Sequence, residues 1–365
     1  MNNIFNKIFT FALLVSILCL GFLIGGYIIP TYEDTTYDTI FPDSKYINDD
    51  SKINSIDYTS NLDMTIEESQ TGIVTVYAKE GENITSQGSG FMYTSDHIMT
   101  NEHVASGNED YYVKYQNGEW SSAEFIGSDI ETDIAILQPE YSPDYVSVLP
   151  MQMSLTTIGE PVVAIGSPSG LDTTITTGVV SSNKLLMDME TTFGIPDSIQ
   201  TDAALNPGNS GGPLLSKTNA AVIGVNRATG GENIGYAVSS RMAHKVGQDL
   251  IEDGNHKHRY IGITTEELEY KSDIYENSNV NYGLVVSDVI DSSPASELSL
   301  RSEDSDYVYP DILLKIDDKK LYTNEDLSSY TALNTSPGDE IELKIYRQGE
   351  KMTKKVTVGT RITQR

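Results

Sequence analysis

Cysteine is almost absent from this sequence of 365 residues, which contains only Cys19. A single cysteine cannot build an intramolecular disulfide framework, and it cannot supply the several thiolates of a zinc ribbon. Thiol chemistry is therefore excluded as the basis of function.

Basic residues are also scarce, because 24 Lys and Arg stand against 53 Asp and Glu, for a formal net charge of −29. Nucleic-acid binding needs a basic face that releases counterions from phosphates, so no nucleic-acid partner is expected. The acidity fits either an ordinary self-repelling surface or a surface suited to high salt, and composition does not choose between them. No Gly-x-x-x-x-Gly-Lys-Ser/Thr loop is present, and no cofactor is expected.

Charge is missing altogether from residues 8–29. As a helix these 22 residues span about 33 Å, enough to cross a hydrocarbon core of about 30 Å. A cleaved signal peptide is the rival interpretation, but its apolar run is shorter, at about 7–15 residues. Residues 1–30 are therefore predicted to form an uncleaved membrane anchor. Since Lys7 precedes the span and the next base is Lys45, the N-terminus is expected in the cytoplasm and the remaining chain outside.

Residues 31–70 lack periodicity and hold ten acids against two lysines. They are predicted to form an acidic stalk, although their tyrosines could instead dock on a neighbouring subunit.

The pattern changes from Gly72 onward to short β-branched and aromatic runs separated by Gly, Asn, Asp and Ser. Such runs are typical of an all-β barrel or sandwich, and no repeat of 34 or 40 residues indicates a solenoid or propeller. The predicted strands lie at 73–77, 111–115, 134–137, 161–165, 178–180 and 221–225.

Ser210 lies in the glycine-rich segment 206–214, NPGNSGGPL. Glycines on both sides let the backbone bend and leave room for a substrate main chain, as an exposed nucleophile requires. A glycine turn with a passive serine is the alternative for this segment alone. However, His103 follows a predicted strand and Asp133 directly precedes another. The order His103, Asp133, Ser210 is that of the chymotrypsin-type triad, whereas α/β-hydrolases and subtilisins use other orders.

Five sequence blocks follow one another along the chain: TNEHV at 100–104, DIAIL at 133–137, GSPSGL at 166–171, TGVVS at 177–181 and TDAALNPGNSGGPL at 201–214. In this order they resemble the HtrA/Deg family of trypsin-like serine proteases, and the resemblance covers roughly residues 71–360. The resemblance implies a mainly β fold with a chymotrypsin/trypsin-like double β-barrel protease domain at 71–254 and a small α+β PDZ domain at 255–365.

The resemblance assigns a role to each member of the triad. Ser210 is the nucleophile, His103 the general base and Asp133 the group that orients the imidazole. The oxyanion hole is expected at Gly208, Asn209 and Ser210, through the backbone N–H groups of Gly208 and Ser210.

The specificity pocket is expected to be small and apolar. Ala204 stands where trypsin-like enzymes carry the floor of this pocket, and Leu205 and Val225 lie nearby. Without an acid to pair with Lys or Arg, cleavage is predicted after Val, Ala, Ile or similar residues.

A helix over 240–251, capped by Ser239 or Ser240 and ended at Gly254, is predicted to close the protease domain. The segment 256–258, HKH, is interpreted as a hinge; the alternative, a metal site, lacks companion ligands.

The second block resembles a PDZ domain. Its expected carboxylate-binding loop comprises Tyr260, Ile261, Gly262 and Ile263, which would receive a chain terminus while an edge strand pairs with the peptide. An acidic insertion at 301–310 is interpreted as a solvated loop rather than a calcium loop, and it leaves open whether the domain binds C-termini.

Together these features predict a membrane-anchored, ATP-independent serine endopeptidase that acts on unfolded or damaged extracytoplasmic proteins. The family resemblance implies a homotrimer and binding of C-terminal peptides at the PDZ domain. The alternative is a membrane-tethered PDZ binding module or chaperone with a latent protease domain.

Overall fold

The computed structural model describes residues 69–107, 110–167, 173–186, 194–227, 234–271, 280–303 and 309–361. The predicted membrane anchor, nearly all of the predicted stalk and the centre of the acidic insertion lie outside these residues. Within the described part, no helix has the length and apolar character needed to cross a bilayer.

The first six strands form a closed antiparallel barrel in the order β1-β2-β3-β6-β5-β4. Its interior is filled by β-branched and aromatic side chains such as Val74, Val76 and Tyr115, none more than 1% exposed. Alternate residues of a strand face opposite sides, so these runs bury one face inside the barrel. The strands are β1 (Ile73–Glu80), β2 (Asn83–Met92), β3 (Ile98–Thr100), β4 (Asp110–Lys114), β5 (Trp120–Asp129) and β6 (Ile134–Pro139).

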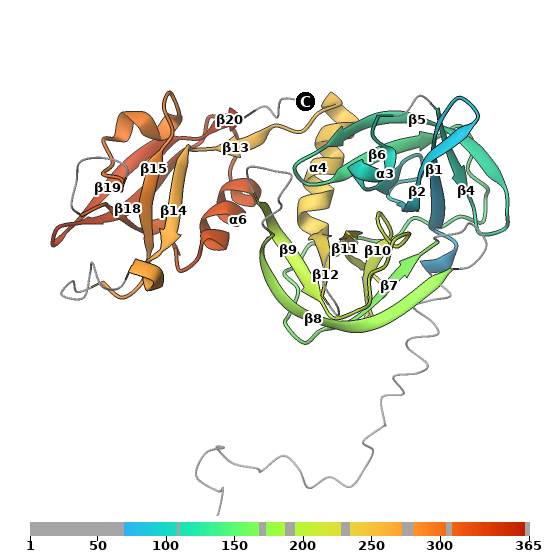
Figure 1. Cartoon of the computed structure of the whole chain (residues 1–365), viewed down its shortest axis with the longest axis horizontal. Helices are drawn as coiled ribbons and strands as arrows, with labels where there is room; N and C mark the ends of the chain where they lie inside the picture. The colour runs from blue at the N-terminus through green and yellow to red at the C-terminus, as the bar shows by residue number, and fades with distance from the viewer. Residues whose placement is uncertain are drawn as a thin grey trace, which may run out of the picture. The chain divides into compact units, whose positions relative to one another are not determined.

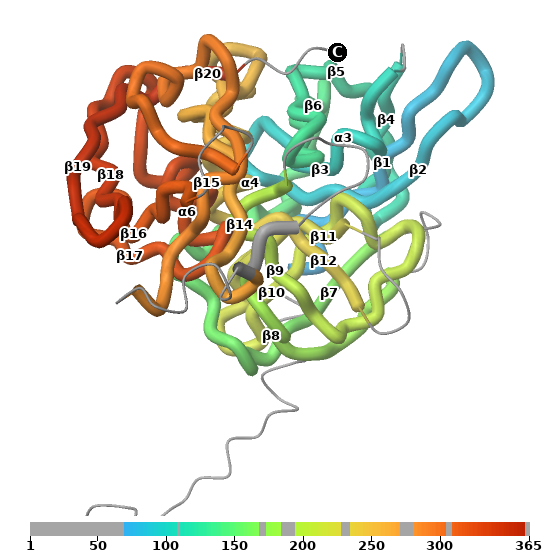
Figure 2. The backbone as a smooth tube through the Cα atoms, turned by 60° about the vertical axis from the view of Figure 1, so that its left-hand side comes forward, coloured from blue at the N-terminus to red at the C-terminus, as the bar shows by residue number. Residues whose placement is uncertain are grey.

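The next six strands close a second barrel in the order β10-β11-β12-β9-β8-β7, and the two groups of strands are separate in both views (Figures 1 and 2). The strands are β7 (Pro161–Gly166), β8 (Thr174–Leu186), β9 (Ile195–Thr201), β10 (Pro213–Ser216), β11 (Val222–Arg227) and β12 (Gly235–Ser239). Each of the six predicted strands overlaps one of the observed strands, and none extends beyond it by more than one residue. The expected double barrel is confirmed.

Helix α4 (Ser240–Asp253) follows β12 and packs on both barrels. The Ser239 hydroxyl accepts a hydrogen bond from the Met242 N–H at 3.2 Å, and Gly254 ends the helix with a φ of 73°. Its apolar face, which includes Val246, enters a core that contains residues of both barrels. The predicted helix and its caps are confirmed.

The C-terminal part is built on the sheet β14-β15-β16-β18-β19, with β17 added at β16 and a separate β13–β20 pair. Strand β14 lies at the edge of this sheet. The elements are β13 (His258–Tyr260), β14 (Ile263–Glu267), η1 (Leu268–Lys271), β15 (Leu284–Val289), η2 (Pro294–Leu298), β16 (Ile312–Ile316), β17 (Lys319–Lys320), α6 (Asn324–Asn334), β18 (Glu340–Arg347), β19 (Glu350–Thr357) and β20 (Gly359–Arg361).

Candidate active site

His103 lies on α3 (Glu102–Ala105), a single turn that directly follows β3. The imidazole Nδ1 lies 2.9 Å from both carboxylate oxygens of Asp133, and the backbone N–H of His103 donates to Asp133 Oδ1 at 3.0 Å. This contact requires the proton on Nδ1, since an ionised carboxylate only accepts hydrogen bonds. The imidazole is 47% exposed, so its other nitrogen can face a substrate.

Asp133 is held by its backbone as well as by its side chain. It has a φ of 57°, in the left-handed region, immediately before β6 begins. Its carbonyl accepts hydrogen bonds from the Asn101 amide at 2.8 Å and from the Glu102 N–H at 3.2 Å. The side chain is only 4% exposed, so the carboxylate is shielded from water.

The Arg227 guanidinium is a third charged group in the site, and the sequence analysis did not single it out. Its Nε donates to Asp133 Oδ2 at 2.9 Å, and its side chain is 11% exposed. The two residues are 94 positions apart. No local motif marks this pairing; only the closing of the second barrel brings Arg227 to Asp133.

Burial lowers the pKa of His103, but the hydrogen bond and charge of Asp133 outweigh it, so that the pKa lies above its usual value. The charge of Arg227 acts in the opposite direction to Asp133, and Glu102 adds a small upward contribution to the pKa. An imidazole whose protonated form is stabilised in this way is suited to accept a proton from a nucleophile.

The loop that carries Ser210 is fixed between the two barrels. The Ser210 carbonyl accepts the N–H of Ser89 at 2.8 Å, and the N–H of Gly211 donates to the Asn226 carbonyl at 2.9 Å. Gly211 has a φ of 80°, and a Cβ there would lie 2.2 Å from the Ser89 carbonyl oxygen. Glycine is therefore required at this position by both conformation and space.

The residues expected to form the oxyanion hole lie on the same loop. Gly208 has a φ of 101°, and its carbonyl accepts the Ser89 hydroxyl at 2.5 Å. The N–H of Asn209 donates to the Asn206 carbonyl at 3.0 Å, so this group is engaged within the loop. Asn209 therefore serves as the link between Gly208 and Ser210, whose N–H groups remain the expected donors.

The structure separates the three residues expected to form the specificity pocket. Ala204 is exposed, and Leu205 is partly buried against the core of the second barrel. Val225 is fully buried in the core that contains residues of both barrels and α4. Because it has no exposed surface, Val225 does not line a surface pocket.

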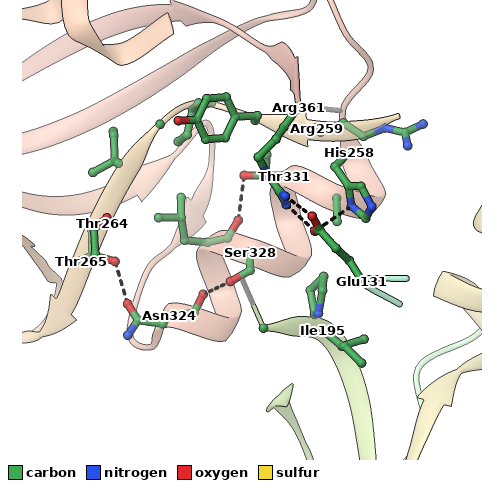
Figure 3. Close-up of a pocket in the computed structure, with 18 of the residues that line it drawn as sticks. Glu131, Ile195, His258, Arg259, Thr264, Thr265, Asn324, Ser328, Thr331 and Arg361 are labelled. Carbon is green, nitrogen blue, oxygen red and sulfur yellow. Dashed lines mark hydrogen bonds and ion pairs between the residues drawn. The ribbon is translucent and has the colours of Figure 1, made fainter. Parts of the chain in front are cut away.

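The expected carboxylate-binding loop borders a cavity of about 470 Å³, which is lined by residues of the PDZ part and also by residues of the barrels such as Glu131 and Ile195 (Figure 3). Gly262 has a φ of 82°, and a Cβ there would lie 2.1 Å from Ser293 Cβ. The Ile261 and Gly262 carbonyls accept hydrogen bonds from Ala295 and Ile290 at 2.9 and 3.0 Å, which fixes the loop. The cavity continues between β14 and α6.

The histidines of the predicted hinge are both paired with carboxylates. His256 Nδ1 lies 2.8 Å from Asp249 Oδ2, and His258 Nε2 lies 2.7 Å from Asp129 Oδ1. Among the described residues no cluster of three or more metal-ligating side chains is found.

Comparisons with known proteins agree with this architecture. Residues 88–225 match the trypsin-like peptidase domain family, and residues 259–358 match the PDZ domain family. The "Serine protease Do-like HtrA" of Bacillus subtilis strain 168 is 33% identical over 293 residues, which cover 74% of this chain and 63% of that protein. The "Probable periplasmic serine endoprotease DegP-like" of Chlamydia trachomatis is 36% identical over 290 residues, which cover 74% of this chain and 54% of that protein.

A solved structure described as "HtrA-type protease AlgW with tripeptide" has a TM-score of 0.67 and 28% identity, and the match covers 84% of this chain and 98% of that one. The two matched domains make the chain a trypsin-like peptidase domain followed by one PDZ domain. Its relatives and structural neighbours are proteases of the HtrA/DegP type, which confirms the family resemblance. The chain spans only 54 to 63% of the length of the two curated relatives named here.

Proposed function

We propose that the protein is a serine endopeptidase of the HtrA type that uses His103, Asp133 and Ser210. The observation that carries the proposal is the Asp133 carboxylate, which is shielded from water and lies 2.9 Å from His103 Nδ1. This contact leaves Nε2 of the ring as the proton acceptor, as a triad requires.

In the proposed reaction, Ser210 Oγ attacks the carbonyl carbon of the scissile peptide bond while its proton passes to His103 Nε2. The N–H groups of Gly208 and Ser210 stabilise the resulting oxyanion. His103 then gives the proton to the leaving amine, the C–N bond breaks and an acyl-enzyme forms. A water molecule, deprotonated by His103, releases the peptide acid and restores Ser210.

Labelling with a fluorophosphonate probe tests the nucleophile. The full chain is expected to become labelled on Ser210, and Ser210→Ala is expected to lose both the label and peptide hydrolysis. The loss in turnover should be on the order of 10⁶, as in other triads. Ser216, buried on β10, offers a matched control, since Ser216→Ala should keep the label. Cleavage retained by Ser210→Ala would refute the assignment. If the intact protein does not react at all, the alternative of a PDZ binding module with a latent protease domain is favoured.

The proposed cleavage preference is for small aliphatic residues, because Ala204 and Leu205 offer no charge to pair with Lys or Arg. A peptide library digested with the full chain should yield fragments ending in Val, Ala or Ile. A profile dominated by Lys or Arg would contradict this preference.

We propose that the PDZ part binds the C-termini of substrate or regulatory peptides. The support is the cavity between edge strand β14 and α6, across which Thr265 donates to Asn324 Oδ1 at 2.7 Å (Figure 3). An extended peptide can pair with β14 while its carboxylate reaches the loop at Gly262. Peptides with a free C-terminus should bind the full chain, and the same peptides with an amidated terminus should bind at least tenfold more weakly. Equal affinities would exclude carboxylate recognition.

The proposed location is the cell membrane, with one span in residues 1–30, the N-terminus in the cytoplasm and both domains outside. The uncharged segment 8–29 supports this proposal, as does the description of the Chlamydia trachomatis relative as periplasmic. The protein should remain in the membrane pellet after alkaline carbonate extraction, and external protease should degrade both domains in spheroplasts. Release by carbonate would contradict the anchor.

The proposed substrates are unfolded or damaged proteins, and the proposed assembly is a homotrimer. Both rest on the HtrA type of the relatives. Reduced, unfolded proteins should be cleaved faster than their native forms. Light scattering of the detergent-solubilised protein should give three times the mass of one chain, and a monomeric mass would contradict the trimer.

A further inference from the structure

Arg227 is the last residue of β11 and lies beside the catalytic carboxylate. Its Nε donates to Asp133 Oδ2 at 2.9 Å, and both side chains are largely buried, at 11% and 4% exposure. The preceding residue, Asn226, exchanges backbone hydrogen bonds with Gly211 and Gly212 at 2.9 and 2.8 Å. The strand that positions the guanidinium is thus bonded to the loop that carries Ser210.

A permanent positive charge at this place affects the triad directly. In a triad the aspartate charge stabilises the imidazolium that forms when the histidine accepts a proton. A guanidinium within hydrogen-bond distance of the same carboxylate offsets part of that charge. The charged groups that act on His103 are Asp133 and Glu102, which are acidic, and Arg227, which is the basic one among them.

We propose that Arg227 is a positioning residue that acts through Asp133: it fixes the Oδ2 end of the carboxylate, and its charge keeps His103 in the neutral, proton-accepting form at lower pH. The proposal rests on the triad proposed above and adds a regulator of its pH range. The charge of Arg227 lowers the pKa of His103, as burial does, against the stronger upward action of Asp133.

The size of the effect follows from the geometry. Two hydrogen bonds of 2.9 Å separate the guanidinium from the imidazole, so the two charges lie roughly 6 Å apart. At an effective dielectric constant of about 20 to 40, loss of the guanidinium charge should raise the pH at which His103 is half protonated by about one to two units. Because the ring is 47% exposed, we expect the lower end of this range, about one pH unit.

The test compares two variants in the full chain. Arg227→Gln removes the charge but keeps a long side chain that can donate a hydrogen bond, whereas Arg227→Lys keeps the charge. Arg241→Gln is the matched control, since Arg241 pairs with Asp197 at 2.5 Å, a carboxylate outside the triad. The measurements are kcat/KM for a peptide from pH 5 to 9 and the NMR titration of ¹³C-labelled histidines, of which the chain has five. His103 is assigned from the signal lost in His103→Gln.

Arg227→Gln is expected to shift the acidic limb of kcat/KM and the midpoint of the His103 titration upward by about one pH unit. Arg227→Lys and Arg241→Gln should shift neither the acidic limb of kcat/KM nor the midpoint of the His103 titration by more than about 0.3 pH units. An unshifted Arg227→Gln, or an equal shift in Arg227→Lys, would overturn the proposal. Failure of Arg227→Gln to fold while Arg241→Gln folds would overturn it too, because Arg227 would then serve the fold. The NMR titration needs no hydrolysis, so it stands even if Ser210 proves not to be the nucleophile.

Discussion

Glu325, in the first turn of α6, is a carboxyl group whose burial should make the stability of the protein depend on pH near neutrality. Its Oε1 accepts hydrogen bonds from the Asp197 N–H at 2.9 Å and from the Ser329 hydroxyl, while Oε2 is buried without a partner among the described residues. Burial is the main cause that raises the pKa of Glu325 to about 7, from a usual value of 4.5. The charges of Asp197 and Asp326 raise the pKa further, whereas the two hydrogen bonds lower it.

The sign of the effect follows from proton binding. Between pH 4.5 and about 7 the folded protein holds a proton on Glu325 that the unfolded chain has released. The folded state is therefore favoured at low pH and loses stability as the pH rises through this window. The 2.5 pH units between the two pKa values, at about 1.4 kcal/mol each, give a loss of about 3 kcal/mol.

Glu325→Gln removes the titration and keeps the acceptor oxygen. Relative to the parent protein, the variant should be more stable by only about 1 kcal/mol at pH 5 and by about 3 kcal/mol at pH 8. In a domain of this size, that difference corresponds to roughly 10 °C in the unfolding midpoint, measured by scanning calorimetry at both pH values. Glu297→Gln, which removes an exposed carboxylate on η2, is the control and should change neither value. A difference between parent and Glu325→Gln that is the same at pH 5 and pH 8 would refute this reasoning.

Two further substitutions test the buried pair of the PDZ part and the nucleophile loop. Asp311 is fully buried and receives two hydrogen bonds from Arg347 at 2.7 and 2.6 Å, so Arg347→Met should cost about 3–5 kcal/mol in urea unfolding of the PDZ transition. A cost below about 1 kcal/mol would show that the pair is not needed. Gly211→Ala should lower kcat/KM by about 100-fold or more, because its Cβ would lie 2.2 Å from the Ser89 carbonyl and displace the Ser210 loop. Peptide binding at the PDZ part should stay unchanged, and near-normal hydrolysis by the variant would contradict this account of the loop.

Much of the fold was predictable from local patterns. Runs such as 161–165 have the β-branched composition of strands, and α4 is bounded by a cap at Ser239 and a stop at Gly254. The order His103, Asp133, Ser210 predicted that the barrels bring the histidine and the aspartate together, and the 2.9 Å contact confirms that these two meet. The roles of the three residues stay predictions.

Side-chain direction and distant pairing were not predictable in the same way. Val225 was expected near the specificity pocket because of its position in the chain, but it is buried in the core, and the pairing of β11 with β10 shifts register between Leu214 and Leu215. A shift of one residue in a strand reverses the face of every side chain, and composition does not fix that register. Arg227 meets Asp133 across 94 residues, and only barrel closure creates the contact.

The turn at 129–133 holds Asp133 in place through contacts within the turn and with residues far away in the sequence. Asp133 has a φ of 57°, a conformation that costs a non-glycine residue on the order of 1 kcal/mol or more, so neighbouring contacts must hold it. Within the turn, the Asp129 carboxylate accepts the N–H and hydroxyl of Thr132 at 2.9 and 2.6 Å. From outside, His258 contacts Asp129 at 2.7 Å, and Arg361 pairs with Glu131. These hydrogen bonds join charged and buried groups, and such hydrogen bonds are stronger than those between neutral groups. Together they offset the conformational cost of the left-handed residue Asp133. The Asp133 carboxylate therefore owes its position to β13 and β20, which carry His258 and Arg361, as well as to the barrel that carries it.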